Sequence, residues 1–117
     1  MYGEGQLQID KNVCFNSNTR ILCRDNIHIG KDTMFGPNCV IIDYDHDYMS
    51  KDWRNKYKTS SIEIESNVWV GANAVILRGT IIEDNCVIGA GMIAKGIYKA
   101  NTIYYADRNV KFKQIVR

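Results

Sequence analysis

The chain has 117 residues, the length of one domain, and its 15 basic and 13 acidic residues leave a net charge of +2. This balance excludes the clustered basic excess of a nucleic-acid-binding protein, and no apolar run approaches the ~20 residues of a membrane span. We expect residues 1–117 to form a single domain with no nucleic-acid partner and no membrane insertion.

Large apolar residues recur every six positions in the first part of the chain. Two rows, separated by a step of eight residues, comprise Ile9, Phe15 and Ile21, and then Ile29, Phe35 and Ile41. Neither the 3.6-residue period of a helix nor simple alternation along a strand gives this spacing. Between Ile27 and Ile29, alternation points His28 outward, so we expect an exposed surface histidine.

Residues 43–61 interrupt the period and contain the segment D-Y-D-H-D-Y-M, with His46 at its centre. In a polar loop such a histidine is either a general base or an exposed side chain without a role. The neighbouring aspartates Asp43, Asp45 and Asp47 either fix its tautomer or keep the loop soluble, and the residues alone do not choose between these readings.

The period of six resumes after the insertion and then runs without a break. Its main row comprises Ile64, Val70, Ile76, Ile82, Ile88 and Ala94. A second row of mostly smaller side chains, four places later in each repeat, comprises Val68, Ala74, Thr80, Cys86 and Met92. Glycine, asparagine and acidic residues fill the positions between the rows, as expected for turns.

A short strand and a turn, repeated every six residues, predict a β-solenoid in which three repeats make one triangular coil. Each coil buries its apolar residues on those of the next coil, about 4.8 Å away, and the backbone hydrogen bonds run between coils. The alternative is an irregular antiparallel sandwich with coincidental spacing, which unbroken six-residue steps make a poor account of the sequence.

The cysteines and the N-terminus favour a cytoplasmic protein. No secretory signal is apparent at the N-terminus. The four cysteines form no C-x-x-C pair, and we expect all of them to be reduced and buried: Cys14, Cys23, Cys39 and Cys86.

The segments N-V-W-V-G (67–71) and V-I-G-A-G (87–91), set in this repeat, resemble the hexapeptide-repeat acyltransferases, and among them the maltose, galactoside and capsular-polysaccharide O-acetyltransferases. The resemblance covers roughly residues 9–100. It implies an all-β, left-handed parallel β-helix with an inserted loop at about 43–61 and a short C-terminal extension. It also implies a homotrimer that uses acetyl-CoA, without a metal, in polysaccharide biosynthesis.

The same resemblance implies roles for individual residues. His46 falls in the loop that carries the catalytic histidine, and Arg54-Asn55 matches an R-N pair of that loop. The resemblance assigns acceptor contacts to Asn16 and Asp25, and cofactor contacts to Ala72, Ala90, Ala94, Lys95 and Lys113. Asn16 is alternatively a corner residue in a left-handed turn, the alanines simple packing residues, and Lys95 a surface charge.

Four positions carry further expectations. Relatives tend to have an acceptor-binding aspartate where this chain has Arg24, with Asp25 one place later, so the resemblance does not identify the acceptor. We expect Trp69 to pack under the inserted loop, and Arg78, which replaces a common proline, to be incidental. The tail lacks the G-N-P turn of the relatives.

Acetyl transfer from a thioester to a hydroxyl needs a base for the hydroxyl proton and donors for the tetrahedral oxyanion. We therefore predict an acetyl-CoA-dependent O-acetyltransferase acting on a sugar or glycan intermediate, with His46 as general base at a subunit interface and the amide near Ala72 polarising the thioester carbonyl. The alternatives are N-acetylation of an amino sugar, since a histidine base also serves an amine, and a non-catalytic β-helix scaffold.

Two other solenoid functions do not fit. A β-helical carbonic anhydrase needs three zinc-binding histidines, and this chain has two. An ice-binding solenoid needs regular threonine rows, which the threonines of this sequence do not form.

Overall fold

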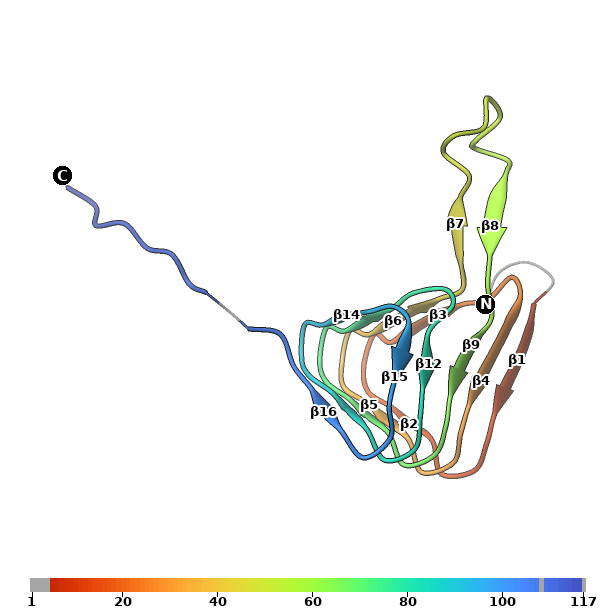
Figure 1. Ribbon diagram of the computed structural model, residues 1–117, viewed down its shortest axis with the longest axis horizontal. Helices are drawn as coiled ribbons and strands as arrows, with labels where there is room; N and C mark the ends of the chain where they lie inside the picture. The colour runs from red at the N-terminus through yellow and green to blue at the C-terminus, as the bar shows by residue number, and fades with distance from the viewer. Residues whose placement is uncertain (1–4, 108, 117) are drawn as a thin grey trace.

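The computed structural model describes residues 5–107 and 109–116, in which short strands are joined by turns. Three parallel sheets contain most of them (Figure 1). The first contains β1 (Gln6–Ile9), β4 (Asn26–Ile29), β9 (Ile62–Ile64), β12 (Ile81–Ile82) and β15 (Ile97–Tyr98). The second contains β2 (Cys14–Phe15), β5 (Met34–Phe35), β10 (Trp69–Val70), β13 (Val87–Ile88) and β16 (Ile103–Tyr104). The third contains β3 (Arg20–Leu22), β6 (Val40–Ile42), β11 (Val75–Ile76) and β14 (Ile93–Ala94).

Within these three sheets, strands that follow one another in the sequence lie in different sheets, and pairing joins one coil to the next. On the first sheet, for example, Ile29 is in register with Ile64, and on the second Val70 with Ile88, always in parallel. The chain therefore winds as a parallel β-helix, and the left-handed, all-β fold expected from the sequence is confirmed.

The six-residue rows form the core. From Ile64 to Ala94 every member of the main row is fully buried, as are Ile29, Phe35 and Ile41. Ile9 and Phe15 occupy the same row but are 43% and 38% exposed, because they belong to the first coil and only one neighbouring coil covers them. Thr80, in the second row, is also buried. Its hydroxyl proton has acceptors in the carbonyls of Leu77 at 2.6 Å and Ala94 at 3.1 Å, and this hydrogen bonding compensates for the loss of water.

The expectation for the cysteines is wrong at one position. Cys23, Cys39 and Cys86 are free and buried, whereas Cys14 is free but exposed, because it is the outward-facing residue of β2. Burial, together with the Asp43 carboxylate, raises the pKa of Cys23 to about 11. The three buried thiols are therefore poor nucleophiles at neutral pH.

Asparagines make the corners of the helix. Among the residues that the structure describes, eight other than glycine have a positive φ near 60°, and all but Asp32 are asparagines: Asn12, Asn18, Asp32, Asn38, Asn67, Asn73, Asn85 and Asn101. Asparagine tolerates this left-handed conformation better than most residues. At one corner their amides also link successive coils, since Asn67 donates to Asn85 at 3.0 Å and Asn85 to Asn101 at 2.9 Å.

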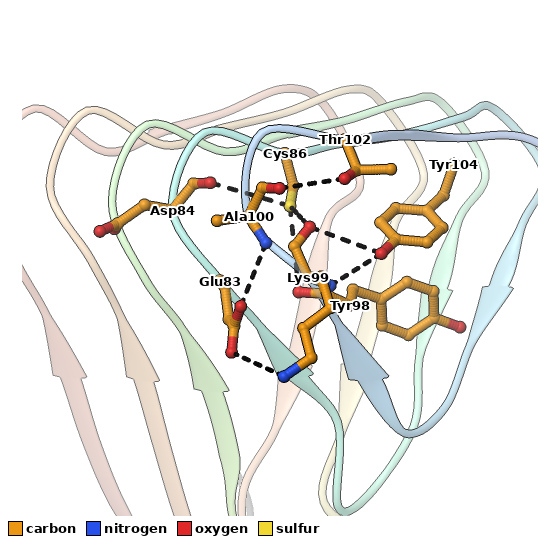
Figure 2. Close-up of polar contacts among 8 residues, drawn as sticks. All are labelled: Glu83, Asp84, Cys86, Tyr98, Lys99, Ala100, Thr102 and Tyr104. Atoms are coloured by element: carbon orange, nitrogen blue, oxygen red, sulfur yellow. Dashed lines mark hydrogen bonds and ion pairs between the residues drawn. The ribbon is translucent and has the colours of Figure 1, made fainter.

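Polar side chains close the C-terminal end of the solenoid (Figure 2). The backbone N–H of Lys99 donates to Tyr104 Oη at 2.7 Å, and that of Ala100 donates to Glu83 Oε1 at 3.1 Å. The Cys86 thiol donates to the Lys99 carbonyl at 2.9 Å. These bonds satisfy backbone N–H and carbonyl groups of Lys99 and Ala100, which a following coil would otherwise satisfy.

Two segments leave the solenoid (Figure 1). The insertion is an antiparallel hairpin of β7 (Tyr44–His46) and β8 (Tyr57–Thr59), which stands out between β6 and β9. After Tyr105 the described tail residues are exposed and run away from the helix. No helix in the described ranges is long and apolar enough to cross a membrane.

His28 points outward, as predicted, but it is half-buried and paired rather than freely exposed. Its Nε2 lies 3.0 Å from Asp10 and its Nδ1 2.6 Å from Glu63, so the imidazole links three successive coils. The hydrogen bond to Asp10, and then that to Glu63, raises the pKa of His28, and the same bond to His28 lowers the pKa of Asp10.

These pKa shifts predict a pH-dependent contribution of His28 to stability. The stabilisation is present below the ordinary histidine pKa of about 6.5 and is lost as the pH rises through the higher folded value. It also needs ionised Asp10, so it is lost again as the pH falls through the lowered pKa of that carboxyl. We expect His28→Gln to reduce Tm more at pH 5.5 than at pH 8.5, measured by calorimetry. An equal reduction at both values would contradict this linkage.

Candidate functional site

His46 ends β7 on the face of the hairpin that carries aromatic side chains. Residues directly opposite in an antiparallel pair point to the same side, and here His46 faces Tyr57 while Tyr44 faces Thr59. The intervening pair, Asp45 and Lys58, points to the other side. The hairpin therefore presents one aromatic and one charged face.

A backbone carbonyl orients His46. Nδ1 lies 3.1 Å from the carbonyl oxygen of Trp53. A carbonyl only accepts, so Nδ1 carries the proton and Nε2 keeps its lone pair. The ring also packs against Tyr57 at 4.8 Å and against Trp53, edge-on, at 5.8 Å. The side chain is exposed, so this base-competent nitrogen is accessible.

The neighbouring aspartates do not orient His46. Asp43 is fully buried, and its two oxygens accept the backbone N–H groups of Arg24 at 2.7 Å and Asp25 at 2.8 Å. Asp43 therefore anchors the base of the hairpin to the previous coil, and neither of the two readings, tautomer fixation or solubility, applies to it.

The other two aspartates hold the hairpin through ion pairs. Asp45 accepts from Arg78 Nε at 2.8 Å, and Asp47 lies 3.9 Å from Lys58. Arg78 is thus not incidental, because it ties the charged face of the hairpin to the coil that follows it.

Arg24 and Asp25 lie at the base of the hairpin. The guanidinium carbon of Arg24 lies 3.8 Å from the ring centroid of Tyr57 and 4.9 Å from that of Tyr44. Asp25, predicted to contact the acceptor, places Oδ1 3.4 Å from the amide of Asn26. Both residues are half-buried and belong to the same corner of the helix as His46.

A second feature is an apolar groove of about 270 Å³ at another corner. Its lining comprises Trp69, Gly71, Ala72, Val87, Ile88, Gly89 and Ala90. Trp69 is 51% exposed in this groove, so the expectation that it packs under the inserted loop is wrong; the tryptophan that contacts His46 is Trp53. The groove floor depends on Gly71, where a Cβ would come within 2.5 Å of the Ala90 nitrogen.

The Ala72 backbone N–H points to a chemical use of the groove. The carbonyl of Ala72 accepts from Gly91 N, but within the described residues the N–H of Ala72 has no hydrogen-bond acceptor. In the previous coil, Pro37 occupies the position stacked on Ala72, as the hydrogen bond from Asn73 N to the Pro37 carbonyl shows. Proline has no N–H. An unpaired donor beside an apolar groove is suited to a polarised carbonyl.

Six of the eight predicted site residues fall at two corners of the helix. Asn16, Ala72 and Ala90 lie where the second sheet turns into the third, whereas Asp25, His46 and Lys95 lie where the third sheet turns into the first. The third sheet separates the two sets. One chain therefore does not bring His46 to the groove.

The contacts and burial of four predicted residues, Asn16, Ala94, Lys95 and Lys113, bear on their expected roles. Asn16 donates its amide to the Phe35 carbonyl at 2.9 Å and has no positive φ, so it is not a left-handed corner. Ala94 is fully buried, and its carbonyl accepts from Leu77 N. Lys95 is exposed, with its backbone N–H on Tyr98 Oη. Lys113 is exposed and belongs to the tail that runs away from the helix.

A larger hollow of about 340 Å³ runs along the first sheet beside His28. Both nitrogens of that imidazole are engaged by carboxylates, so it has no lone pair to act as a base. In the described part of the chain no group of three or more His, Cys, Asp or Glu side chains could hold a metal ion.

Comparisons with known proteins agree with this architecture. The family described as "Bacterial transferase hexapeptide (six repeats)" matches residues 61–91. The chain is 31% identical to the putative lipopolysaccharide biosynthesis O-acetyl transferase WbbJ of Escherichia coli K12, over 87% of this chain and 57% of that protein. The chain thus spans little more than half of that relative's length.

Two solved structures are similar in fold and sequence. A maltose O-acetyltransferase from Clostridium difficile 630 superimposes with a TM-score of 0.76 at 31% identity, over 83% of this chain and 52% of that one. A hexapeptide-repeat acetyltransferase from Vibrio cholerae, solved in complex with acetyl-CoA, gives 0.77 at 26% identity, over 84% of this chain and 54% of that one.

Proposed function

We propose that the chain is a bacterial hexapeptide-repeat transferase that transfers an acetyl group from acetyl-CoA to a hydroxyl of a sugar or glycan intermediate. The observation that carries the proposal is the state of His46. Its Nδ1 is held by the Trp53 carbonyl, and its Nε2 is exposed with a free lone pair at the end of a projecting hairpin.

In the proposed mechanism, His46 Nε2 accepts the proton of the acceptor hydroxyl as the oxygen attacks the thioester carbonyl. The Trp53 carbonyl stabilises the resulting imidazolium through the Nδ1–H bond. The Ala72 N–H donates to the oxyanion of the tetrahedral species. When this species collapses, the C–S bond breaks, the acetyl group stays on the acceptor oxygen and the thiolate takes the proton from His46.

We expect the groove to hold the pantetheine arm of acetyl-CoA, whose methylene groups would lie on the apolar lining. Its lining consists of apolar side chains and glycines, and it offers the Ala72 N–H where a thioester carbonyl would lie. Lys95 and Lys113 are proposed to contact the phosphates, and Asn16 and Asp25 the acceptor. Since acetyl-CoA is an intracellular metabolite, we also propose a cytoplasmic reaction.

We further propose that the site is shared between subunits of a homotrimer. The hairpin and the groove lie at different corners of one chain, so a neighbouring copy would supply the groove for each His46. A closed ring of three copies repeats this heterologous contact three times and leaves no unpaired surface.

The proposal is tested by titrating acetyl-CoA into the protein in a calorimeter and by following CoA release with a thiol reagent in the presence of a panel of sugars. We expect saturable binding and acceptor-dependent thiol release. Mass spectrometry of the products distinguishes O- from N-acetylation. The absence of binding at millimolar acetyl-CoA would leave a non-catalytic scaffold as the better account.

A further inference from the structure

At the base of the hairpin, the guanidinium of Arg24 has no counter-ion among the described residues. Arg24 is fixed by its own backbone N–H, which donates to Asp43 Oδ1 at 2.7 Å. Its guanidinium rests on the rings of Tyr57 and Tyr44, with centroids at 3.8 and 4.9 Å. Among the residues that the structure describes, it makes no ion pair, and its Nε is buried without a hydrogen-bond partner.

The nearby carboxylates make other contacts. Asp25 Oδ1 accepts from the Asn26 amide at 3.4 Å and forms no ion pair with Arg24. Both oxygens of Asp43 accept backbone N–H groups, Asp45 is paired with Arg78, and Asp47 lies beside Lys58. The aromatic rings offset part of the loss of water around the guanidinium, but they supply no acceptor for its N–H groups. A planar fork of donors in this position is suited to a carboxylate or a phosphate.

Tyr57 connects this cation to His46. The same ring contacts the Arg24 guanidinium at 3.8 Å and the His46 imidazole at 4.8 Å. Tyr57 and His46 also share the aromatic face of the hairpin. A sugar whose hydroxyl reaches His46 Nε2 therefore has its other substituents within reach of the guanidinium.

We propose that Arg24 binds an anionic group of the acceptor, so that the preferred acceptor is a sugar bearing a carboxylate or a phosphate. This inference rests on the proposed acetyl transfer, because it names the acceptor class of that same site. Arg24 acts here as a specificity residue and takes no part in the proton transfer.

The test compares matched methyl glycosides that differ only at C6: methyl glucoside, its uronic acid (methyl glucosiduronate) and methyl glucoside 6-phosphate. We expect kcat/KM for one or both anionic sugars to exceed that of the neutral sugar in the native protein. Arg24→Gln should lower kcat/KM for the anionic acceptor about 10- to 100-fold, mainly through KM. The neutral sugar should be nearly unaffected, and Arg24→Lys should retain part of the preference. The two anionic arms show which group is bound.

Several outcomes separate this inference from the proposed function. An equal loss for neutral and anionic sugars in Arg24→Gln, or no loss for either, overturns the role of Arg24 while leaving acetyl transfer intact. A native protein that acetylates neutral sugars better than anionic ones also overturns it. No consumption of acetyl-CoA with any sugar, and no binding of acetyl-CoA, instead removes the proposed function, and the inference with it. The Tm of each variant and its turnover of the neutral sugar report whether the hairpin is intact.

Discussion

Replacing His46 by alanine should reduce kcat for acetyl transfer about 10²- to 10⁴-fold, the usual contribution of a positioned general base. Nε2 is the exposed nitrogen with a free lone pair, because Nδ1 donates to the Trp53 carbonyl. The variant should bind acetyl-CoA normally, since the groove lies at another corner of the helix. It should also keep its Tm, because the imidazole is exposed and contributes little burial.

The measurement is thiol release at saturating acetyl-CoA, together with calorimetric binding and light scattering of the assembly. His28→Gln, assayed at pH 8.5, is the matched control. It removes the other histidine, whose two nitrogens are already engaged by Asp10 and Glu63, and should leave kcat unchanged. Full turnover by His46→Ala would remove this residue from the mechanism.

The sequence was sufficient for the fold because the period is a local property that repeats. Ile64, Val70 and Ile76, one on each sheet, are buried for the same reason: each points into the helix and packs on the equivalent residues of the neighbouring coils. Exceptions arise where that symmetry ends. Ile9 is exposed because it lies in the first described coil, which only one described coil covers. Cys14 is exposed for another reason: it occupies an outward position, like the stacked Met34 and Trp69 of the next coils.

The site was less predictable, because its contacts join residues that the period does not relate. The interruption at 43–61 identified His46, but the pairing of Asp45 with Arg78 spans 33 residues and depends on where the hairpin leaves the coil. Asp43 was not expected to be buried, since a carboxylate in a polar segment is ordinarily solvated; it is the backbone N–H groups of Arg24 and Asp25 that compensate it.

The orienting partner of His46 was missed for a related reason. Side-chain candidates can be read from a sequence, whereas the Trp53 carbonyl belongs to the backbone and is defined only by the path of the hairpin. The signal that was available is Trp53 itself, an aromatic residue in the same insertion that packs against the imidazole.

The second large effect is expected from Ala72→Pro, which removes the N–H proposed to stabilise the oxyanion. Loss of one such donor typically lowers kcat about 10²- to 10³-fold. The backbone should accept proline, because the stacked turn of the previous coil has the same form. Gly36-Pro37-Asn38 lies against Gly71-Ala72-Asn73, and Asn38 and Asn73 have φ values of 61° and 60°.

This substitution is measured by steady-state kinetics and by acetyl-CoA binding. We expect kcat to fall while the affinity for acetyl-CoA changes little, since the apolar lining of the groove remains. Pro37→Ala is the matched control: it makes the reciprocal exchange one coil away and should leave kcat unchanged. A kcat of Ala72→Pro equal to that of the native protein would exclude this N–H as the oxyanion donor.

Together the two variants test whether hairpin and groove come from different chains. If they do, a mixed ring contains contacts in which an Ala72→Pro subunit supplies an intact His46 and a His46→Ala subunit supplies an intact groove. With random mixing at equal amounts, the hairpin of a contact comes from an Ala72→Pro subunit in half of the cases, and the groove comes from a His46→Ala subunit in half of the cases. About a quarter of all contacts therefore have both groups intact. Two inactive proteins, unfolded and refolded together, should therefore recover about a quarter of the native activity. If instead each chain used its own hairpin and groove, no contact would hold both intact groups and the mixture would stay inactive.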